Sequence, residues 1–185
     1  ITLALSAGVL SACGSDSEAD AGSTDTIVFG STISLGQVDP FQMQYKTAQH
    51  NVFDPLVRVL AGGEPEGRIA SEWTQVDDLT WDFTIREGVK FHDGSELTVD
   101  DVVFSFTEPM ANMYLAATLI LNVDAVEAKD ATTVRITTKT PDPLLLNSLT
   151  HISIVPQALY SELGSEEFAK APVGTGAYKL VETDA

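Results

Sequence analysis

The sequence has 185 residues, of which 44% are hydrophobic and 20% charged, with a formal net charge of −17 and a single cysteine. This composition is typical of a globular domain and not of a disordered chain. A surface this acidic repels phosphate backbones, which argues against nucleic acid as a partner. One cysteine excludes an internal disulfide and any metal site built from several cysteines.

The first residues indicate export from the cytoplasm. Residues 1–12 are apolar or small and uncharged, too few to span a bilayer, which favours a secretory signal peptide. No Met or basic residue precedes them, so we expect this signal to be partial. Leu10 to Cys13 matches a bacterial lipobox, which predicts cleavage before Cys13 and lipidation of its sulfur. The alternative is an ordinary signal with an incidental cysteine. Residues 13–25, rich in Ser, Asp, Glu, Ala and Gly, are predicted to be a flexible tether.

The next part of the chain reads as short strands separated by turns, with one helix. That helix should end before Pro55, because proline disfavours helix at the residue before it. The predicted elements are a strand at Thr26–Gly30, a loop at Ser34–Pro40, a helix at about Gln44–Phe53, a strand at Leu56–Leu60 and a turn at Ala61–Gly67.

Residues 73–106 carry the strongest local signals. Apolar and polar residues alternate in Trp81–Arg86, which predicts a strand paired with Trp73–Val76 through the turn Asp77–Thr80. Asp93-Gly94 predicts a tight turn. Thr98 is the expected N-cap of a helix with Asp100 and Asp101 in its first turn. Trp73 and Trp81 are interpreted as core anchors of the hairpin, with ligand stacking as the alternative.

The second half predicts another hairpin and two helices. Its elements are helix and turn at Glu108–Asn122, strands at Val123–Lys129 and Thr133–Lys139, a short helix at Leu144–Leu149, a strand at Ile152–Pro156 and a helix at Gln157–Leu163. The segment Gly174-Thr175-Gly176 lacks the lysine and helix start of a phosphate loop. We interpret it as a crossover between lobes.

The stretch from Leu79 to Phe106 resembles the signature of the extracellular solute-binding proteins of family 5, the peptide- and nickel-binding components of ABC importers. Val38-Asp39-Pro40 and Ala171–Lys179 resemble two further segments of that family, the latter with Ala177 in place of a proline. The signature positions that match in register are Phe83, Ile85, Arg86, Gly88, Val89, Phe91, His92, Asp93, Gly94, Leu97, Thr98, Asp101, Val102, Phe104 and Ser105.

The resemblance implies an α/β fold of the periplasmic-binding-protein type II, with two hinged lobes closing on a ligand. Residues 26–185 would be an N-terminal fragment of that domain. Within it, about 47–171 would form an extra α+β subdomain, and 26–46 and 172–185 would be pieces of lobe I. The signature itself is expected to be turn, cap and core, without touching ligand.

The chemistry expected is binding and not catalysis. No nucleophile, metalloprotease or Walker motif is present, and no catalytic residue, metal site or cofactor is expected. His50, His92 and His151 are interpreted as satisfied structural or surface histidines. By position in the family, the residues expected at the ligand cleft are Met43, Gln44, Tyr45, Asn112, Met113 and Tyr114. The alternative is that these side chains serve only packing or surface.

The predicted function is therefore the substrate-binding component of an ABC importer, capturing a di- or oligopeptide outside the membrane. Its expected partners are the permease and ATPase subunits, and the membrane through a lipid on Cys13. It would lie outside the cytoplasm, anchored to the cell membrane. The alternatives are a nickel chelate, opine or oligosaccharide as ligand, or a surface lipoprotein used in signalling or adhesion.

Overall fold

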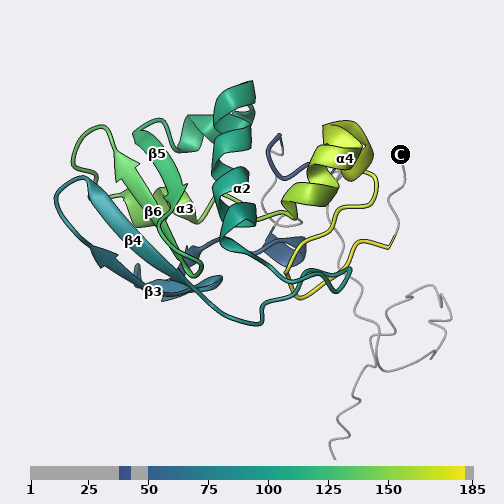
Figure 1. The fold of residues 1–185 in the computed structure, drawn as a ribbon, viewed down its shortest axis with the longest axis horizontal. Coiled ribbons are helices and arrows are strands. Elements are labelled where there is room, and N and C mark those ends of the chain that lie inside the picture. The colour runs from purple at the N-terminus through teal and green to yellow at the C-terminus, as the bar shows by residue number, and fades with distance from the viewer. Residues whose placement is uncertain (1–37, 43–49, 182–185) are drawn as a thin grey trace, which may run out of the picture. The chain divides into compact units, whose positions relative to one another are not determined.

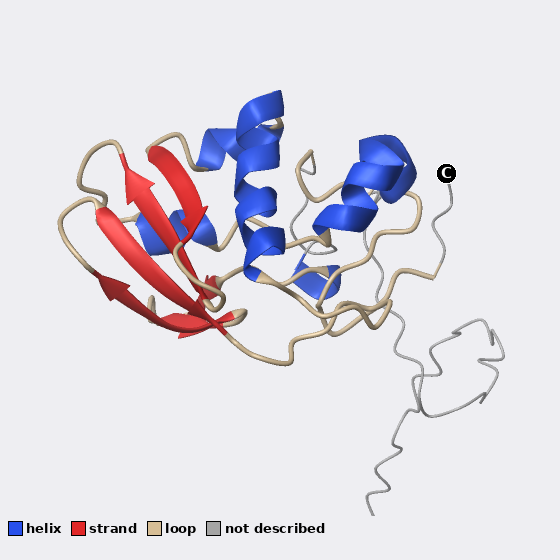
Figure 2. Ribbon diagram, viewed as in Figure 1, coloured by secondary structure: helices blue, strands red, loops and turns tan. Residues whose placement is uncertain are grey.

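A four-stranded antiparallel sheet is the main β-structure in the computed structural model, which describes residues 38–42 and 50–181. Its order is β3-β4-β6-β5 (Figures 1 and 2). The strands are β3 (Ala70–Gln75), β4 (Thr80–Ile85), β5 (Val123–Ala128) and β6 (Thr133–Thr138). The two predicted hairpins are confirmed, with Trp73 opposite Phe83 in one and Val126 opposite Ile136 in the other.

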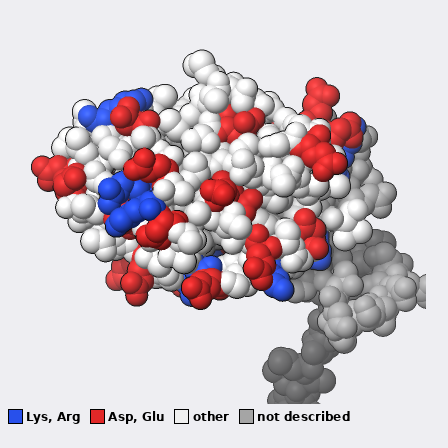
Figure 3. All heavy atoms as spheres, viewed as in Figure 1, with Lys and Arg blue, Asp and Glu red and all other residues white. Residues whose placement is uncertain are grey.

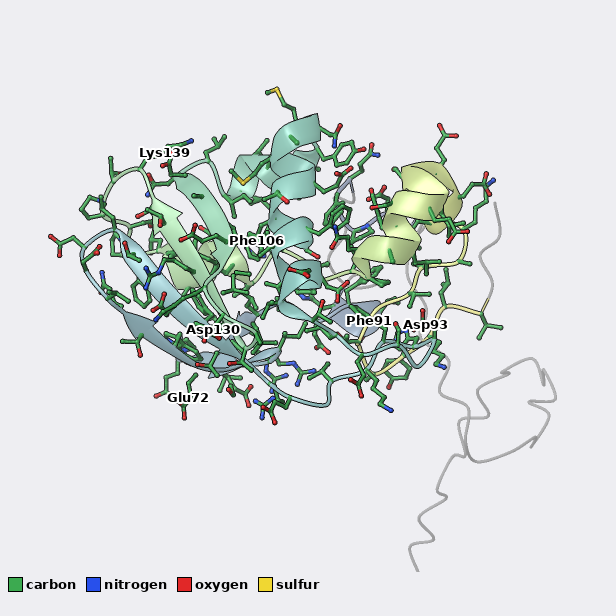
Figure 4. All side chains as sticks on the ribbon, in the orientation of Figure 1. Glu72, Phe91, Asp93, Phe106, Asp130 and Lys139 are labelled. Atoms are coloured by element: carbon green, nitrogen blue, oxygen red, sulfur yellow. The ribbon has the colours of Figure 1, made fainter. Side chains whose placement is uncertain are left out.

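Both hairpins use an aspartate to close the turn. The Asp77 Oδ1 atom accepts the backbone N–H groups of Leu79 at 2.8 Å and Thr80 at 2.9 Å. Asp130, labelled in Figure 4, does the same for Thr132 at 2.9 Å. Hydrogen bonds from the turn backbone lower the pKa of both carboxyls. Turn chemistry and strand alternation therefore agree, which explains why this part was predictable.

The helix α2 (Val99–Asn112) packs against β5 and β6. Phe106, labelled in Figure 4, and Val102 are fully buried between helix and sheet, together with Phe83 of β4 and Ile136 of β6. A 3-10 helix, η1 (Leu115–Leu119), follows α2. Trp73 and Trp81 are half-buried and pack against this core, as the anchor interpretation expects.

The predicted turn at Ala61–Gly67 is wrong in its second half. Here β2 (Pro65–Gly67) pairs with β1 (Val57–Val59), with Val59 opposite Pro65. Pro65 is tolerated because it opens a strand at the edge of a two-stranded sheet, where a missing N–H costs little. The short helix α3 (Leu145–Leu149) packs against β1.

The predicted strand Ile152–Pro156 is also wrong, because the segment is extended and buried but joins no sheet. Its backbone donors bind single acceptors: Ile154 N–H donates to the Asp54 carbonyl at 3.1 Å and Val155 N–H to the Ser105 hydroxyl at 3.0 Å. Helix α4 (Gln157–Phe168) follows and runs past the predicted end, with a break at Gly164, whose φ is +71°.

Several predictions fall outside the described residues: the signal peptide, Cys13, the tether, the strand Thr26–Gly30 and most of the helix Gln44–Phe53. Residues 50–52, at the end of that predicted helix, are helical. Among the described ranges no helix combines the length and apolar character needed to cross a membrane.

Candidate ligand-binding site

The turn at residues 38–42 is held against α4 by one buried carboxylate. Asp39 is 4% exposed and accepts hydrogen bonds from the Phe41 backbone N–H at 2.7 Å, from the Tyr160 hydroxyl at 3.3 Å and from the Ser165 hydroxyl. The amide of Gln42 donates to the same Ser165 hydroxyl at 2.8 Å. Two residues of α4 therefore hold this turn in place, and Met43 is the residue that follows it in the chain.

The same turn also holds the C-terminal end of α2. The ring of Phe41 stacks on Tyr114, with centroids 6.3 Å apart, and meets Tyr160 at 5.1 Å. The Ala116 backbone N–H donates to the Phe41 carbonyl at 3.0 Å. Burial, and secondarily the charge of Asp39, raises the pKa of Tyr160, while burial and then Glu108 raise that of Tyr114. Both phenols therefore stay neutral hydrogen-bonding groups at physiological pH.

Asn112, Met113 and Tyr114 lie together where α2 ends, whereas Met43, Gln44 and Tyr45 lie outside the described residues. The Asn112 amide donates to the Glu108 carbonyl at 3.1 Å and to its carboxylate at 2.9 Å. Met113 has a left-handed backbone (φ 53°) and is 87% exposed. Tyr114 is half-buried on Phe41. The segment therefore contacts Phe41, which stands two residues before the other predicted segment.

Apolar side chains continue this surface beyond Met113. Leu115, Leu119 and Leu121 are exposed there, Leu121 to 70%. Figure 3 shows mainly uncharged atoms around this end of α2. Such a surface offers apolar contact together with the Asn112 amide and the Tyr114 hydroxyl. Lys139 lies at its edge, where its ammonium donates to the Leu121 carbonyl at 2.7 Å. Sequence reasoning missed these leucines and the Asp39 network, although Asp39 stands in a loop it had singled out.

The signature residues at the start of α2 hold this helix in place and do not belong to the candidate site. Asp101 Oδ2 accepts the Thr98 backbone N–H at 2.8 Å and its hydroxyl at 2.7 Å, which completes the predicted cap. Asp101 Oδ1 accepts the Gln157 N–H at 2.8 Å, at the first residue of α4. Ser105 donates to the Asp101 carbonyl at 2.7 Å while accepting from Val155. One carboxylate thus joins the starts of two helices.

The turn after β4 is fixed by His92. Its Nδ1 atom accepts the Gly174 N–H at 3.3 Å, so Nε2 carries the proton and donates to the Gly176 carbonyl at 2.8 Å. The His92 backbone N–H donates to the Gly174 carbonyl at 2.8 Å. His92 is therefore a satisfied histidine, as predicted, and His50 and His151 also have partners.

Residues 174–178 also lie backbone to backbone with residues 51–52. Gly176 N–H donates to the Val52 carbonyl at 2.9 Å, and Tyr178 N–H donates to the Asn51 carbonyl at 3.0 Å. The Thr175 hydroxyl donates to Asp54 at 3.2 Å. The two glycines are required by this close approach, because a Cβ at either position would overlap backbone atoms of Asn51 or Val52.

The capped helix α2 and the Gly174-Thr175-Gly176 segment, within a mixed α/β fold, are features of a class of solute-binding proteins. Residues 64–185 match the family model described as bacterial extracellular solute-binding proteins, family 5 (middle part). The chain belongs to this family, whose members are binding proteins.

Solved structures of the family share the fold. Campylobacter jejuni NikZ in complex with Ni(L-His) matches with a TM-score of 0.74 and 26% identity over 82% of this chain and 32% of its own. Helicobacter pylori DppA in complex with the peptide STSA matches at 0.72 and 28% over 82% and 36%. MoaA in complex with mannopinic acid, from A. tumefaciens R10, matches at 0.74 and 29% over 82% and 33%.

Other proteins of similar sequence are named as transcriptional regulators. The HTH-type transcriptional regulator SgrR of Shigella dysenteriae is 34% identical over 134 residues, 70% of this chain and 23% of the relative. The regulator of the same name in Salmonella typhimurium is 34% identical over 133 residues, 70% of this chain and 22% of the relative. The chain therefore spans about a quarter of the length of these relatives and about a third of the solved ones.

Proposed function

We propose that this chain is part of the substrate-binding component of an ABC importer and captures a di- or oligopeptide outside the membrane. The observation that carries the proposal is family membership together with the match to DppA, which was solved with a peptide. A permease and an ATPase would be the partners that receive and drive the cargo. Nickel chelates and opines are the competing ligands, since NikZ and MoaA were solved with these. An oligosaccharide completes the alternatives.

The binding cycle would rest on two lobes and a hinge. A ligand that contacts both lobes stabilises the closed state over the open one. A ligand of micromolar affinity supplies about 8 kcal/mol, which is shared between its contacts and closure. Met43, Gln44, Tyr45, Asn112, Met113 and Tyr114 would supply contacts from the first lobe. Amide, phenol and thioether groups suit a ligand held through its backbone, with side chains of varied character tolerated.

Three separate calorimetric titrations of the full-length protein test the ligand class. One uses a mixture of tetrapeptides, one uses Ni(L-His) and one uses an opine. Peptide binding that falls severalfold in Met113→Ser, but not in Val76→Ser, would support both ligand and site. Val76 is a fair control because it is also exposed, at 51%, but it lies in the β3–β4 hairpin and not at the end of α2. Binding of only the nickel chelate or the opine would refute the peptide assignment.

Anchoring through Cys13 is a separate part of the proposal, supported by the lipobox. Mass spectrometry of the membrane fraction should find a lipid on an N-terminal Cys13, and Cys13→Ala should release the protein from membranes. A protein that stays membrane-bound after this substitution would refute lipid anchoring. A surface lipoprotein used in signalling or adhesion would carry the same lipid but lack a permease partner, which co-purification tests.

A second candidate function is ligand sensing within a transcriptional regulator, favoured by the 34% identity to the SgrR proteins. Cell fractionation separates the two. An importer receptor is expected outside the cytoplasmic membrane and sensitive to protease in intact protoplasts or spheroplasts. A regulator is expected inside and protected.

A further inference from the structure

A pocket lies on the described body, and none of its described lining residues belongs to the candidate ligand-binding site. It has a volume of about 460 Å³ and lies beside β1, α3 and the segment before β3. Its lining includes His50, Asp54, Arg58, Arg68, Thr150 and His151. A volume of this size is in the range of small-molecule sites.

The pocket places two permanent positive charges side by side on an acidic protein. The whole chain has 10 Lys and Arg against 27 Asp and Glu, yet two arginines line this one pocket. Asp54 is the one carboxylate among the described lining residues, and it is already engaged. It accepts Arg68 Nε at 3.0 Å and Nη2 at 2.6 Å through one oxygen, and the Thr175 hydroxyl through the other.

Both arginines keep donors that the described residues do not use. Arg58 reaches Glu66 through Nε alone, so its Nη1 and Nη2 groups have no acceptor in the described part of the chain. Arg68 spends Nε and Nη2 on Asp54, which leaves its Nη1 group without a described acceptor. A guanidinium presents its N–H groups in a fixed planar fork that matches the oxygens of a carboxylate or phosphate.

Asp54 gives Arg68 a fixed orientation. The Asp54 side chain is only 14% exposed, and it is anchored on its other side by Thr175. The ion pair therefore holds the Arg68 guanidinium at the pocket wall before any ligand arrives, which reduces the ordering cost of binding. The Arg58 side chain is 47% exposed, compared with 36% for Arg68, and can turn toward a ligand on the same wall.

From these contacts we propose that the pocket binds the carboxylate or phosphate group of a small organic anion between Arg58 and Arg68. None of Asn112, Met113 and Tyr114 is among the described residues of this pocket. Asp54 orients one guanidinium, and Glu66 competes with the anion for the other. Inorganic phosphate and citrate are suitable probes, because they present the two oxyanion chemistries without further recognition groups.

The test is calorimetric titration of the full-length protein with each probe, at an ionic strength held constant with sodium chloride. Wild-type protein is expected to bind one or both probes with a dissociation constant of about 1 mM or tighter. Binding of citrate alone assigns a carboxylate ligand, and binding of phosphate alone assigns a phosphate ligand. No saturable binding of either probe overturns the proposal.

Two variants and one control locate the binding. Arg58→Gln should weaken binding about tenfold, as expected for losing a charge-assisted hydrogen bond. Glu66→Gln should strengthen it, because the competing carboxylate is gone. Lys170→Gln removes the same charge from another exposed ion pair, with Glu167, and should leave the affinity unchanged. Equal losses in Arg58→Gln and Lys170→Gln, or no gain in Glu66→Gln, would overturn the assignment.

Discussion

Replacing Gly176 by alanine should separate two segments that now lie backbone to backbone. A Cβ at this position would lie 2.4 Å from the Asn51 carbonyl oxygen and 2.6 Å from the Val52 carbonyl carbon. Neither atom belongs to a flexible side chain, so the segments must move apart. The move costs the hydrogen bonds from Gly176 to Val52, from Tyr178 to Asn51 and from His92 to Gly176. At about 1 kcal/mol each, the expected loss is about 3 kcal/mol.

Native-state hydrogen exchange on the full-length protein measures this change where it occurs. The amides of Gly176 and Tyr178 should exchange about 100-fold faster in Gly176→Ala, which corresponds to about 3 kcal/mol. Gly62→Ala is the matched control. A Cβ at Gly62 meets no atom within 4 Å, and its backbone is not left-handed, so its stability should change by less than about 1 kcal/mol. Equal exchange rates in the two variants would refute the steric argument.

Three further substitutions test the capped helix and the sheet. Asp101→Ala should lower the free energy of unfolding by about 3 kcal/mol, because three donors at the starts of α2 and α4 lose their acceptor. Ser105→Ala should cost about 1–2 kcal/mol, since it leaves the Val155 N–H buried without a partner. Hydrogen bonding by Arg135, followed by Lys129, lowers the pKa of Asp82 from 3.8 to about 2. That stabilisation is present above pH 3.8 and disappears as the pH falls toward 2; Asp82→Asn should remove about 1 kcal/mol at pH 7 after solvent screening.

Urea unfolding at several pH values checks these three variants. Asp124→Asn serves as the control for Asp82→Asn, because Asp124 is exposed on β5 and has no ion pair among the described residues. If Asp82→Asn and Asp124→Asn shift stability equally at pH 7, the Arg135 contact contributes nothing. An Asp101→Ala protein as stable as wild type would mean that the link between the helices is not what fixes α4.

The elements that could be predicted are those whose signals are local. Strand alternation, the aspartate turns and the Thr98 cap each depend on residues within a few positions, and the structure confirms all three. The strand β2 could not be found this way, because Pro65 and Gly67 read as turn residues and only the pairing with β1 makes them a strand. The Ile152–Pro156 segment has a strand-like apolar run, but its donors are satisfied by Asp54 and Ser105 instead of a neighbouring strand.

The candidate site was less accessible to sequence reasoning. Asn112, Met113 and Tyr114 were chosen through the family resemblance, and their role in binding stays a prediction. The network that holds them cannot be read from neighbouring residues, because Asp39 and Tyr160 are 121 positions apart. The same holds for the pocket beside β1 and α3, where Arg58 and Arg68 come near His151 only through the packing of α3 on β1.

The backbone hydrogen bonds between Asn51–Val52 and Gly176–Tyr178 bring the two ends of a long stretch of chain to one place. The stretch between them, which includes the sheet and the helices α2, η1, α3 and α4, therefore begins and ends at the same point, and residues 38–42 make a second contact with it through Tyr160 and Tyr114. Inserts of this form can be exchanged between hosts, because their two ends already meet and no long linker is needed. A transplant cut at these two segments would carry the signature and the sheet together, but it would lose the hydrogen bonds that residues 38–42 make with α4.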